Sequence, residues 1–260
     1  MRKVEARRGR ELAEEWDNLA ADRDAMIGKR LDLSYHHILL PALYELSAQA
    51  LATDAHILDV GCGTGTMATE LAEKHPGCDI TAIDPSPRSI EIAKQERGEF
   101  ANVMFRCASV EDYAKGPVAE SSSDLIIANM LLQNVASLSD VLDACVRVMK
   151  PGAALVFAVA HPCFWPRYWK YEKEPWFRYD TETWIEAPFR TSLSPGGTLT
   201  TTHTHRPLSA YLNAFAATGL SLEEMVEPYP DQGIEGEYPI AWEFPRFLLG
   251  RYRKGGTCGS

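Results

Sequence analysis

Residues 57–66 read Ile-Leu-Asp-Val-Gly-Cys-Gly-Thr-Gly-Thr, and this stretch decides the fold. The apolar residues before Gly61 are typical of a buried strand, and apolar positions recur at helical spacing from Thr66 onward. Alternating glycines between the two let the backbone turn sharply, and they let a ligand approach closer than any Cβ would permit. The stretch therefore predicts a strand, a ligand-binding loop and a helix, although a tight turn without a ligand has the same form.

Short β-branched runs alternate with helical patterns around this loop, from residue 55 to residue 160. Such alternation indicates βαβ units and a parallel sheet. Helices are predicted at 11–21, 38–50, 66–74, 87–97, 138–149 and 208–218. Strands are predicted at 56–60, 79–83, 103–106, 124–129, 153–160, 220–226 and 247–252. We therefore expect an α/β fold with a seven-stranded, mostly parallel sheet and helices on both faces.

The chain has 26 basic and 36 acidic side chains, which give it a formal net charge of −10. Phosphate backbones and anionic lipid surfaces repel such a chain, and the basic residues of 1–30 are balanced by acidic neighbours. We therefore expect no nucleic-acid partner and no membrane. No apolar run approaches the roughly 20 residues that cross a bilayer, no secretory signal is visible, and the cysteines form no C-x-x-C pair. These features favour a cytoplasmic protein with free thiols, Cys258 included.

Two carboxylates flank the glycine loop in the predicted sheet. Asp59 ends the strand before the loop, and Asp84 ends the next strand. Ligands of open α/β sheets bind at the carboxyl ends of strands, where an acid can accept both hydroxyl protons of a ribose. Gly63, Gly65 and Ala68 also fit the loop of a dinucleotide-binding protein. Asp59 argues against a dinucleotide because its charge would face the pyrophosphate, whereas it favours a nucleoside with ammonium and sulfonium charges.

Residues 59–65 resemble motif I of class I S-adenosylmethionine (SAM)-dependent methyltransferases, and Asp84 occupies that family's ribose-binding position. Residues 147–152, Arg-Val-Met-Lys-Pro-Gly, are similar to the family's turn before the fifth strand. The resemblance spans about residues 38–253. It implies a Rossmann-like fold, SAM as the cofactor, and methyl transfer to a small organic acceptor in specialised metabolism.

The resemblance also implies which residues hold the cofactor. The methionine end would lie against residues 59–63, the ribose and adenine against 84–85, the adenine amine against 109–111, and the sulfonium near 129–130. A residue of the covering N-terminal helix completes the set, which comprises Tyr35, Asp59, Gly61, Cys62, Gly63, Asp84, Pro85, Ser109, Val110, Glu111, Asn129 and Met130. The chain departs from the family at Gln133 and Asn134, where many relatives carry a histidine.

A hydroxyl or ammonium acceptor must also lose a proton, and histidine titrates closest to neutral pH. His161 directly follows the predicted strand 153–160, so it should lie at the carboxyl edge of the sheet, above the SAM methyl group. His161 is the first candidate base; the alternative is a structural role, in which it shapes a turn together with Pro162. His203 and His205 share one face if residues 200–205 form a strand, and His205 is the second candidate base. We expect no metal at this H-x-H pair, because no acidic or cysteine partner is spaced nearby.

Residues 164–189 hold ten aromatic side chains, whereas aromatic residues make up 10% of the whole chain. The family usually places its acceptor-binding elaboration after the fifth strand, so these rings could form a lid for a flat, hydrophobic or cationic acceptor. The candidate substrate-binding residues are Phe164, Trp165, Tyr168, Trp169 and Trp184. A satellite core under the insertion and the interface of a homodimer are the alternatives.

The chain thus divides into N-terminal helices over the cofactor (1–54), a SAM-binding core (55–160), an aromatic cap (161–206), and a C-terminal helix with the final strands (207–260). Three other functions remain open: RNA or protein methylation, a non-catalytic partner subunit that keeps the fold, and a nicotinamide-dependent oxidoreductase. The acidic balance disfavours the first. The two carboxylates beside the loop disfavour the others.

Overall fold

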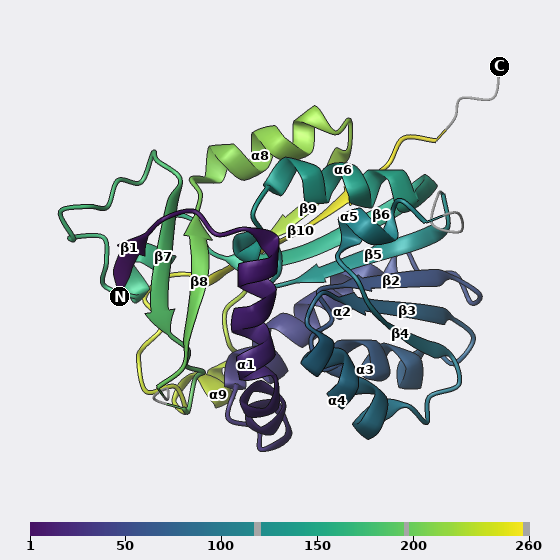
Figure 1. Ribbon diagram of the computed structural model, residues 1–260, viewed down its shortest axis with the longest axis horizontal. Helices are drawn as coiled ribbons and strands as arrows, with labels where there is room; N and C mark the ends of the chain where they lie inside the picture. Colours follow the sequence, from purple (N-terminus) through teal and green to yellow (C-terminus); the bar gives the residue numbers. More distant parts are fainter. Residues whose placement is uncertain (117–120, 195–197, 257–260) are drawn as a thin grey trace.

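The computed structural model describes residues 1–116, 121–194 and 198–256, so Cys258 lies outside the described residues. A seven-stranded sheet forms the centre of the molecule (Figure 1). Its strands lie in the order β4 (Val103–Cys107), β3 (Asp79–Asp84), β2 (His56–Val60), β5 (Ser123–Asn129), β6 (Met149–Ala160), β10 (Phe247–Arg253) and β9 (Ser221–Val226). Strands β2 to β6 are parallel, and β10 is antiparallel to both of its neighbours. The expected seven-stranded, mostly parallel sheet is therefore confirmed.

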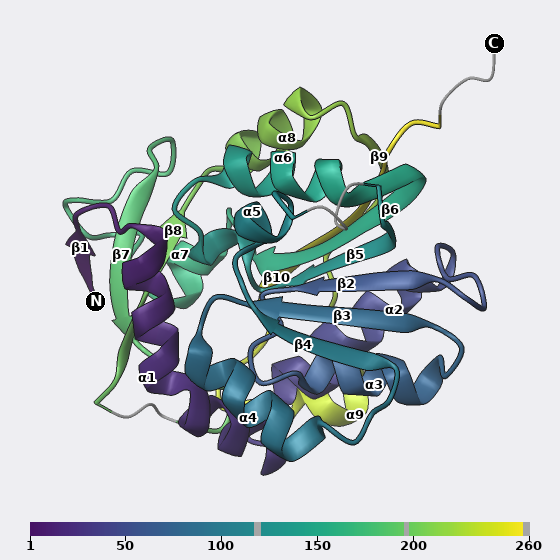
Figure 2. The same cartoon turned by 45° about the vertical axis from the view of Figure 1, so that its right-hand side comes forward.

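Both faces of this sheet are covered by helices (Figure 2). One face packs against α2 (Leu40–Ala48), α3 (Thr66–Lys74) and α4 (Pro87–Arg97), and the other against α5 (Val110–Tyr113), α6 (Leu138–Val148) and α8 (Leu208–Ala217). Successive side chains of a strand point to opposite faces, so Ile57 of β2 enters one core and Leu58 enters the other. A strand buried on both faces must be apolar throughout, which explains the unbroken apolar run at 153–160.

Helices α3 and α4 begin at the carboxyl ends of β2 and β3, where the sequence places their start signals. α3 begins at Thr66, directly after the glycine loop. α4 begins at Pro87, and the hydroxyl of Ser86 accepts the backbone N–H of Ser89 at 3.0 Å. A capping hydroxyl and a proline at the first helical position both favour a helix start. The two loops therefore emerge side by side at the same edge of the sheet.

The order of the strands creates a cleft at this edge. From β2 the chain crosses to β3 on one side, whereas β5 pairs with β2 on the other side. The loops after β2 and β5 therefore diverge, and such a switch point is where ligands bind in open α/β sheets.

A second, three-stranded sheet lies beside the first, and the sequence did not predict it as a unit. Its order is β1 (Arg2–Val4), β7 (Thr183–Pro188) and β8 (Thr200–His205), all antiparallel. β8 matches the conditional strand at 200–205, whereas β1 and β7 were not predicted. The aromatic insertion after β6 therefore folds partly as a β-hairpin, with the short helix α7 (Trp165–Tyr168) preceding it.

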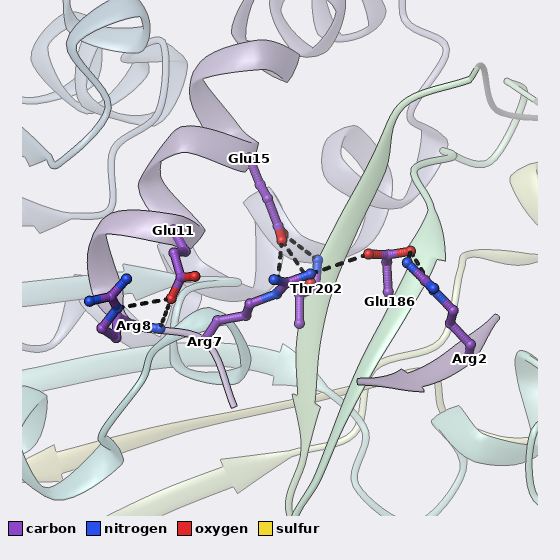
Figure 3. A network of polar contacts seen from close by, with 7 residues as sticks. All are labelled: Arg2, Arg7, Arg8, Glu11, Glu15, Glu186 and Thr202. Carbon is purple, nitrogen blue, oxygen red and sulfur yellow. Dashed lines mark hydrogen bonds and ion pairs between the residues drawn. The ribbon is translucent and has the colours of Figure 1, made fainter. Parts of the chain in front are cut away.

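Helix α1 (Gly9–Gly28) joins this small sheet to the main one, and it is longer than the expected 11–21. The Glu15 carboxylate accepts the backbone N–H of Thr202 at 2.6 Å and the hydroxyl of Thr202 at 2.8 Å (Figure 3). At the other side of α1, the Asp17 carboxylate accepts the Ser86 hydroxyl at 2.8 Å and the Arg88 N–H at 2.7 Å. These bonds hold α1 across the edge where the strand loops emerge.

The remaining elements differ from expectation in small ways. The helix expected at 38–50 begins as a π-helical turn, η1 (Tyr35–Leu39), before α2, and β6 begins four residues earlier than expected, at Met149. Two further short segments are η2 (Leu132–Asn134) and α9 (Gln232–Glu235). Within the described residues, no helix has the length and apolar character needed to span a membrane.

Candidate active site

A pocket of about 760 Å³ is lined by the carboxyl ends of the strands and by helix α1. Its volume is within the range of roughly 300–1,000 Å³ typical of small-molecule sites. One face of α1 lines it with residues that recur at helical spacing, namely Gly9, Arg10, Leu12, Ala13, Trp16, Ala20, Arg23 and Ile27. The N-terminal helix therefore forms one wall of the pocket.

The glycine loop approaches its neighbours so closely that side chains would not fit. Gly61 has φ +72°, and a Cβ on it would lie 2.8 Å from Cδ1 of Leu131. Gly65 has φ +87°, and a Cβ there would lie 2.5 Å from Cε1 of Phe105. Gly63 also has positive φ, but the space beside it is open. Gly61 and Gly65 thus shape the loop, and Gly63 leaves room in the pocket for a ligand.

Asp84 fixes the loop against the next strand. Its carboxylate accepts the backbone N–H of Gly63 at 2.9 Å and that of Ser86 at 2.8 Å. Burial raises the pKa of Asp84, and these two N–H groups oppose the rise because they stabilise the charged form. One carboxylate therefore joins both ligand-facing loops, and its oxygens retain further acceptor capacity.

Asp59 is the most unusual group of the pocket. Its side chain is 1% exposed, and its Oδ2 atom is buried without a hydrogen-bond partner. Burial, reinforced by the nearby charge of Asp84, raises the pKa of Asp59 to about 7. A buried carboxylate is costly unless a partner satisfies it. The arrangement therefore suits a ligand that brings a positive charge.

Other buried polar atoms of the pocket wall are also without protein partners. They are the Tyr35 hydroxyl, Thr66 Oγ1, Asn129 Oδ1, Gln133 Oε1, Trp169 Nε1 and His203 Nε2. Buried polar groups are normally hydrogen-bonded, so the concentration of unpartnered ones in one pocket indicates a polar ligand.

The amide NH₂ groups of Gln133 and Asn134 both donate to the Met130 carbonyl, at 2.6 and 2.8 Å, and so stabilise the loop after β5.

The structure brings the expected cofactor residues together. All twelve line the pocket: Tyr35, Asp59, Gly61, Cys62, Gly63, Asp84, Pro85, Ser109, Val110, Glu111, Asn129 and Met130. This chemistry fits SAM, since Asp59 offers an unsatisfied acceptor to an ammonium and Asp84 offers acceptor capacity to a ribose. Burial keeps Cys62 a neutral thiol, with its pKa well above the ordinary value.

The two expected histidine bases do not line this pocket. His161 is 2% exposed; its Nδ1 accepts the Cys163 N–H at 3.1 Å and its Nε2 donates to Glu227 at 2.6 Å. This loop-fixing pattern matches the structural alternative for His161. His205 Nε2 donates to the Tyr179 carbonyl at 2.9 Å, which turns that ring away as well.

The imidazole that does line the pocket is His203, on the same face of β8. Its Nε2 has no hydrogen-bond partner, and burial, with a smaller effect of His205, lowers the pKa of His203 to about 4. The ring is therefore neutral at physiological pH. Within the described residues, no group of three or more metal-binding side chains gathers here or elsewhere.

Some aromatic residues of the insertion line the pocket, and others pack away from it. Trp165, Tyr168 and Trp169 line the pocket, whereas Phe164 and Trp184 do not. Phe164 stacks on Phe244 with ring centroids 5.5 Å apart. Trp184, in β7, is buried at 8% exposure.

A separate ring cluster lies deeper in the insertion. Tyr171 is 1% exposed and packs against Trp176 and Phe177, with centroid distances of 6.0 and 5.1 Å. Part of the stretch thus forms a pocket wall, and part forms a satellite core.

Several lining residues were not expected from the sequence. Trp16 and Phe189 pack edge to face at 5.7 Å, one from α1 and one after β7. Arg246 enters from the segment before β10. The apolar spacing on α1 could have indicated Trp16, but the other two reach the pocket only through long-range packing.

Comparisons with known proteins agree with this geometry. A family model described as a methyltransferase domain matches residues 51–182. The chain is 32% identical over 126 residues to a malonyl-[acyl-carrier protein] O-methyltransferase of Paenibacillus sp. (strain JDR-2), covering 48% of the chain and 45% of that protein. It is 33% identical over 121 residues to a ubiquinone biosynthesis O-methyltransferase of Xanthomonas oryzae pv. oryzae (strain PXO99A), covering 46% of the chain and 49% of that protein. The matched part thus spans about half the length of these curated relatives.

Among solved structures, the fold is similar to that of a putative SAM-dependent methyltransferase from Listeria monocytogenes. The TM-score is 0.65 at 20% sequence identity, over 83% of this chain and 97% of that one. This likeness concerns the fold.

Proposed function

The chain belongs to the methyltransferase domain family, and we propose that it transfers a methyl group from SAM to an oxygen atom of a small organic acceptor. The observation that carries the proposal is the buried, unpartnered carboxylate of Asp59 beside the glycine loop. An anion in this position attracts an amino-acid nucleoside with a positive charge and repels a diphosphate. The twelve residues named above would hold the cofactor.

When bound, SAM supplies a methyl group on a cationic sulfur. The protein then has to align the acceptor with that methyl group and exclude water. The α1 face around Trp16 and the rings of Trp165 and Trp169 would enclose the acceptor, because they line the same pocket as the cofactor residues.

We further assign proton removal from the acceptor to His203. It is the imidazole that lines the pocket, and an acceptor hydroxyl would supply the hydrogen-bond partner that its Nε2 lacks. Neither His161 nor His205 offers such a nitrogen toward the pocket, since each ring is held by the contacts described above.

Oxygen as the acceptor atom is supported by the names of the matched relatives, both O-methyltransferases. A small organic acceptor is supported by the volume of the pocket, about 760 Å³, and by the net charge of −10, which disfavours RNA. We also propose a role in specialised metabolism, which the resemblance to the family implies.

The experiment uses SAM with a labelled methyl group, the purified protein, and a cell extract separated into small molecules, protein and RNA. We expect label to enter the small-molecule fraction, and we expect Asp59→Asn to slow that transfer by about tenfold or more at SAM concentrations below saturation. Label in protein or RNA alone would contradict the proposed acceptor class. No transfer to any fraction, by a protein that binds SAM, would favour a non-catalytic subunit.

A further inference from the structure

We propose that Arg246 binds a carboxylate on the methyl acceptor, an inference that rests on the proposed function. Three arginines of the described residues are buried: Arg206, Arg246 and Arg251, at 2%, 3% and 4% exposure. Arg206 forms an ion pair with Glu182 at 2.8 Å, and Arg251 forms one with Glu223 at 2.8 Å. Arg246 has no carboxylate within 4 Å among the described residues, although it lines the pocket. A buried charge is normally paired, so the missing anion points to a ligand.

The surroundings of Arg246 leave part of its guanidinium free for that anion. The rings of Tyr168 and Trp242 lie over it, each centroid 4.2 Å from Cζ. Its Nη2 donates to the carbonyls of Ile240 and Ala241, at 2.5 and 2.9 Å. Nε and Nη1 have no acceptor in the described part of the chain, and neither is among its fully buried unpartnered atoms. The rings cover the faces, two carbonyls fix one nitrogen, and the other donors remain available.

The position of Arg246 favours the acceptor over the cofactor as the source of the carboxylate. The register of the sheet places Asp59, Ile127, Val156 and Arg251 in one row. Phe247 pairs with Ala160, four residues nearer the pocket edge than that row. Neighbouring strands lie about 4.8 Å apart and each residue rises about 3.3 Å along a strand. The start of β10 is three strands and four residues away from Asp59, which places it about 14 Å across the sheet and about 13 Å along it. In SAM the ammonium and carboxylate share one carbon atom, so an ammonium at Asp59 keeps that carboxylate away from Arg246.

The walls around Arg246 indicate the kind of molecule that carries the carboxylate. Trp165, Tyr168 and Trp169 line this part of the pocket, and Arg190 lies over the Trp169 ring at 4.0 Å. Arg190 is exposed, so Arg246 is the buried guanidinium at this end; it balances one negative charge, whereas a phosphate ester carries nearly two at neutral pH. The acidic end of the pocket therefore suits a cationic cofactor, and the opposite end suits a flat, unsaturated monocarboxylic acid.

The test measures binding of matched probes to the protein saturated with S-adenosylhomocysteine (SAH). The probes are benzoate, 4-hydroxybenzoate, cinnamate and indole-3-acetate, each with its carboxamide, plus phenyl phosphate, in ligand-observed NMR. We expect at least one acid to bind at millimolar concentration and its amide to bind about tenfold or more weakly. Arg246→Gln should weaken the acid by about tenfold to a hundredfold, and Arg246→Lys by less.

The matched control is Arg167→Gln. Arg167 is an exposed arginine on α7 that pairs with Glu243 and lies over the Phe244 ring, outside the pocket. It should leave acid binding unchanged. SAH affinity should stay within about twofold in every variant, which also reports that each one is folded.

Equal binding of acids and amides, no binding of any acid, or a preference for phenyl phosphate would overturn the inference. The inference would also fail if Arg246→Gln lost affinity for SAH but kept its affinity for 5′-methylthioadenosine, which lacks the amino-acid carboxylate. Arg246 would then hold the carboxylate of the cofactor. Failure of the wild-type protein to bind SAH at all would instead overturn the proposed function.

Discussion

Replacing Asp59 with Asn should stabilise the ligand-free protein while it weakens SAH binding. The buried carboxyl has a pKa of about 7, compared with an ordinary value of 3.8. Between these values the folded protein holds a proton that the unfolded chain has released, so stability falls as the pH rises. From pH 5 to pH 8 the loss is about 3 kcal/mol, because the slope of about 1.36 kcal/mol for each pH unit acts up to about pH 7 and then ends. Asparagine has nearly the same shape and does not titrate, so the variant should escape this loss.

Thermal denaturation of the ligand-free protein at pH 5 and pH 8 measures the effect. For a chain of 260 residues, 3 kcal/mol corresponds to a Tm change of about 5 °C. The wild-type Tm should therefore fall by about 5 °C more than that of Asp59→Asn between the two pH values. The control is Asp79→Asn, which removes an exposed carboxylate at the opposite edge of the same sheet. Its pH profile should follow the wild type.

The same substitution should weaken SAH by about tenfold to a hundredfold, because the ammonium loses a charged partner. Wild-type affinity should also decline below pH 7, since Asp59 must release its proton to receive the ammonium. Identical pH profiles for wild type and variant, together with unchanged SAH affinity, would refute the reasoning.

Two further pairs of substitutions test the loop and the base. Gly65→Ala should lower the free energy of unfolding by about 3 kcal/mol, because its Cβ would lie 2.5 Å from the Phe105 ring at φ +87°. Gly152→Ala, at φ +81° with nothing within 4 Å, should lower it by only about 1 kcal/mol; equal losses in urea denaturation would contradict the close approach. His203→Gln should lower kcat by roughly a hundredfold or more with any acceptor that turns over. His161→Gln should lower Tm and leave kcat unchanged, and the opposite pattern would restore His161 as the base.

The central sheet could be predicted because its signals are local. The apolar run at 153–160, the glycine loop, and the Ser86–Pro87 helix start each determine the conformation of their own segment. The small sheet could not be predicted in this way. β1 pairs Arg2 with Glu186, and no local pattern reports a partner so distant in sequence.

The two ends of the pocket also differ in how far local sequence signals determine them. Eleven of the twelve expected cofactor residues lie at the carboxyl ends of strands or shortly after them, where strand order fixes their place, and Tyr35 lies in η1; all twelve line the pocket. Which way a histidine ring turns depends on its neighbours. His161 is turned by Glu227 and by the Cys163 N–H, contacts that the sequence pattern does not contain. Arg246 likewise reaches the pocket only because β10 pairs with β6.

The acidic end of the glycine loop should select an amino-acid nucleoside with an ammonium group over a nucleoside diphosphate. Titration calorimetry with SAH and with NAD, on wild type and on Asp84→Ala, measures this selection. SAH should bind to the wild type and about tenfold or more weakly to the variant, and NAD should give no heat. NAD binding in place of SAH, or SAH affinity that ignores the loss of Asp84, would contradict it.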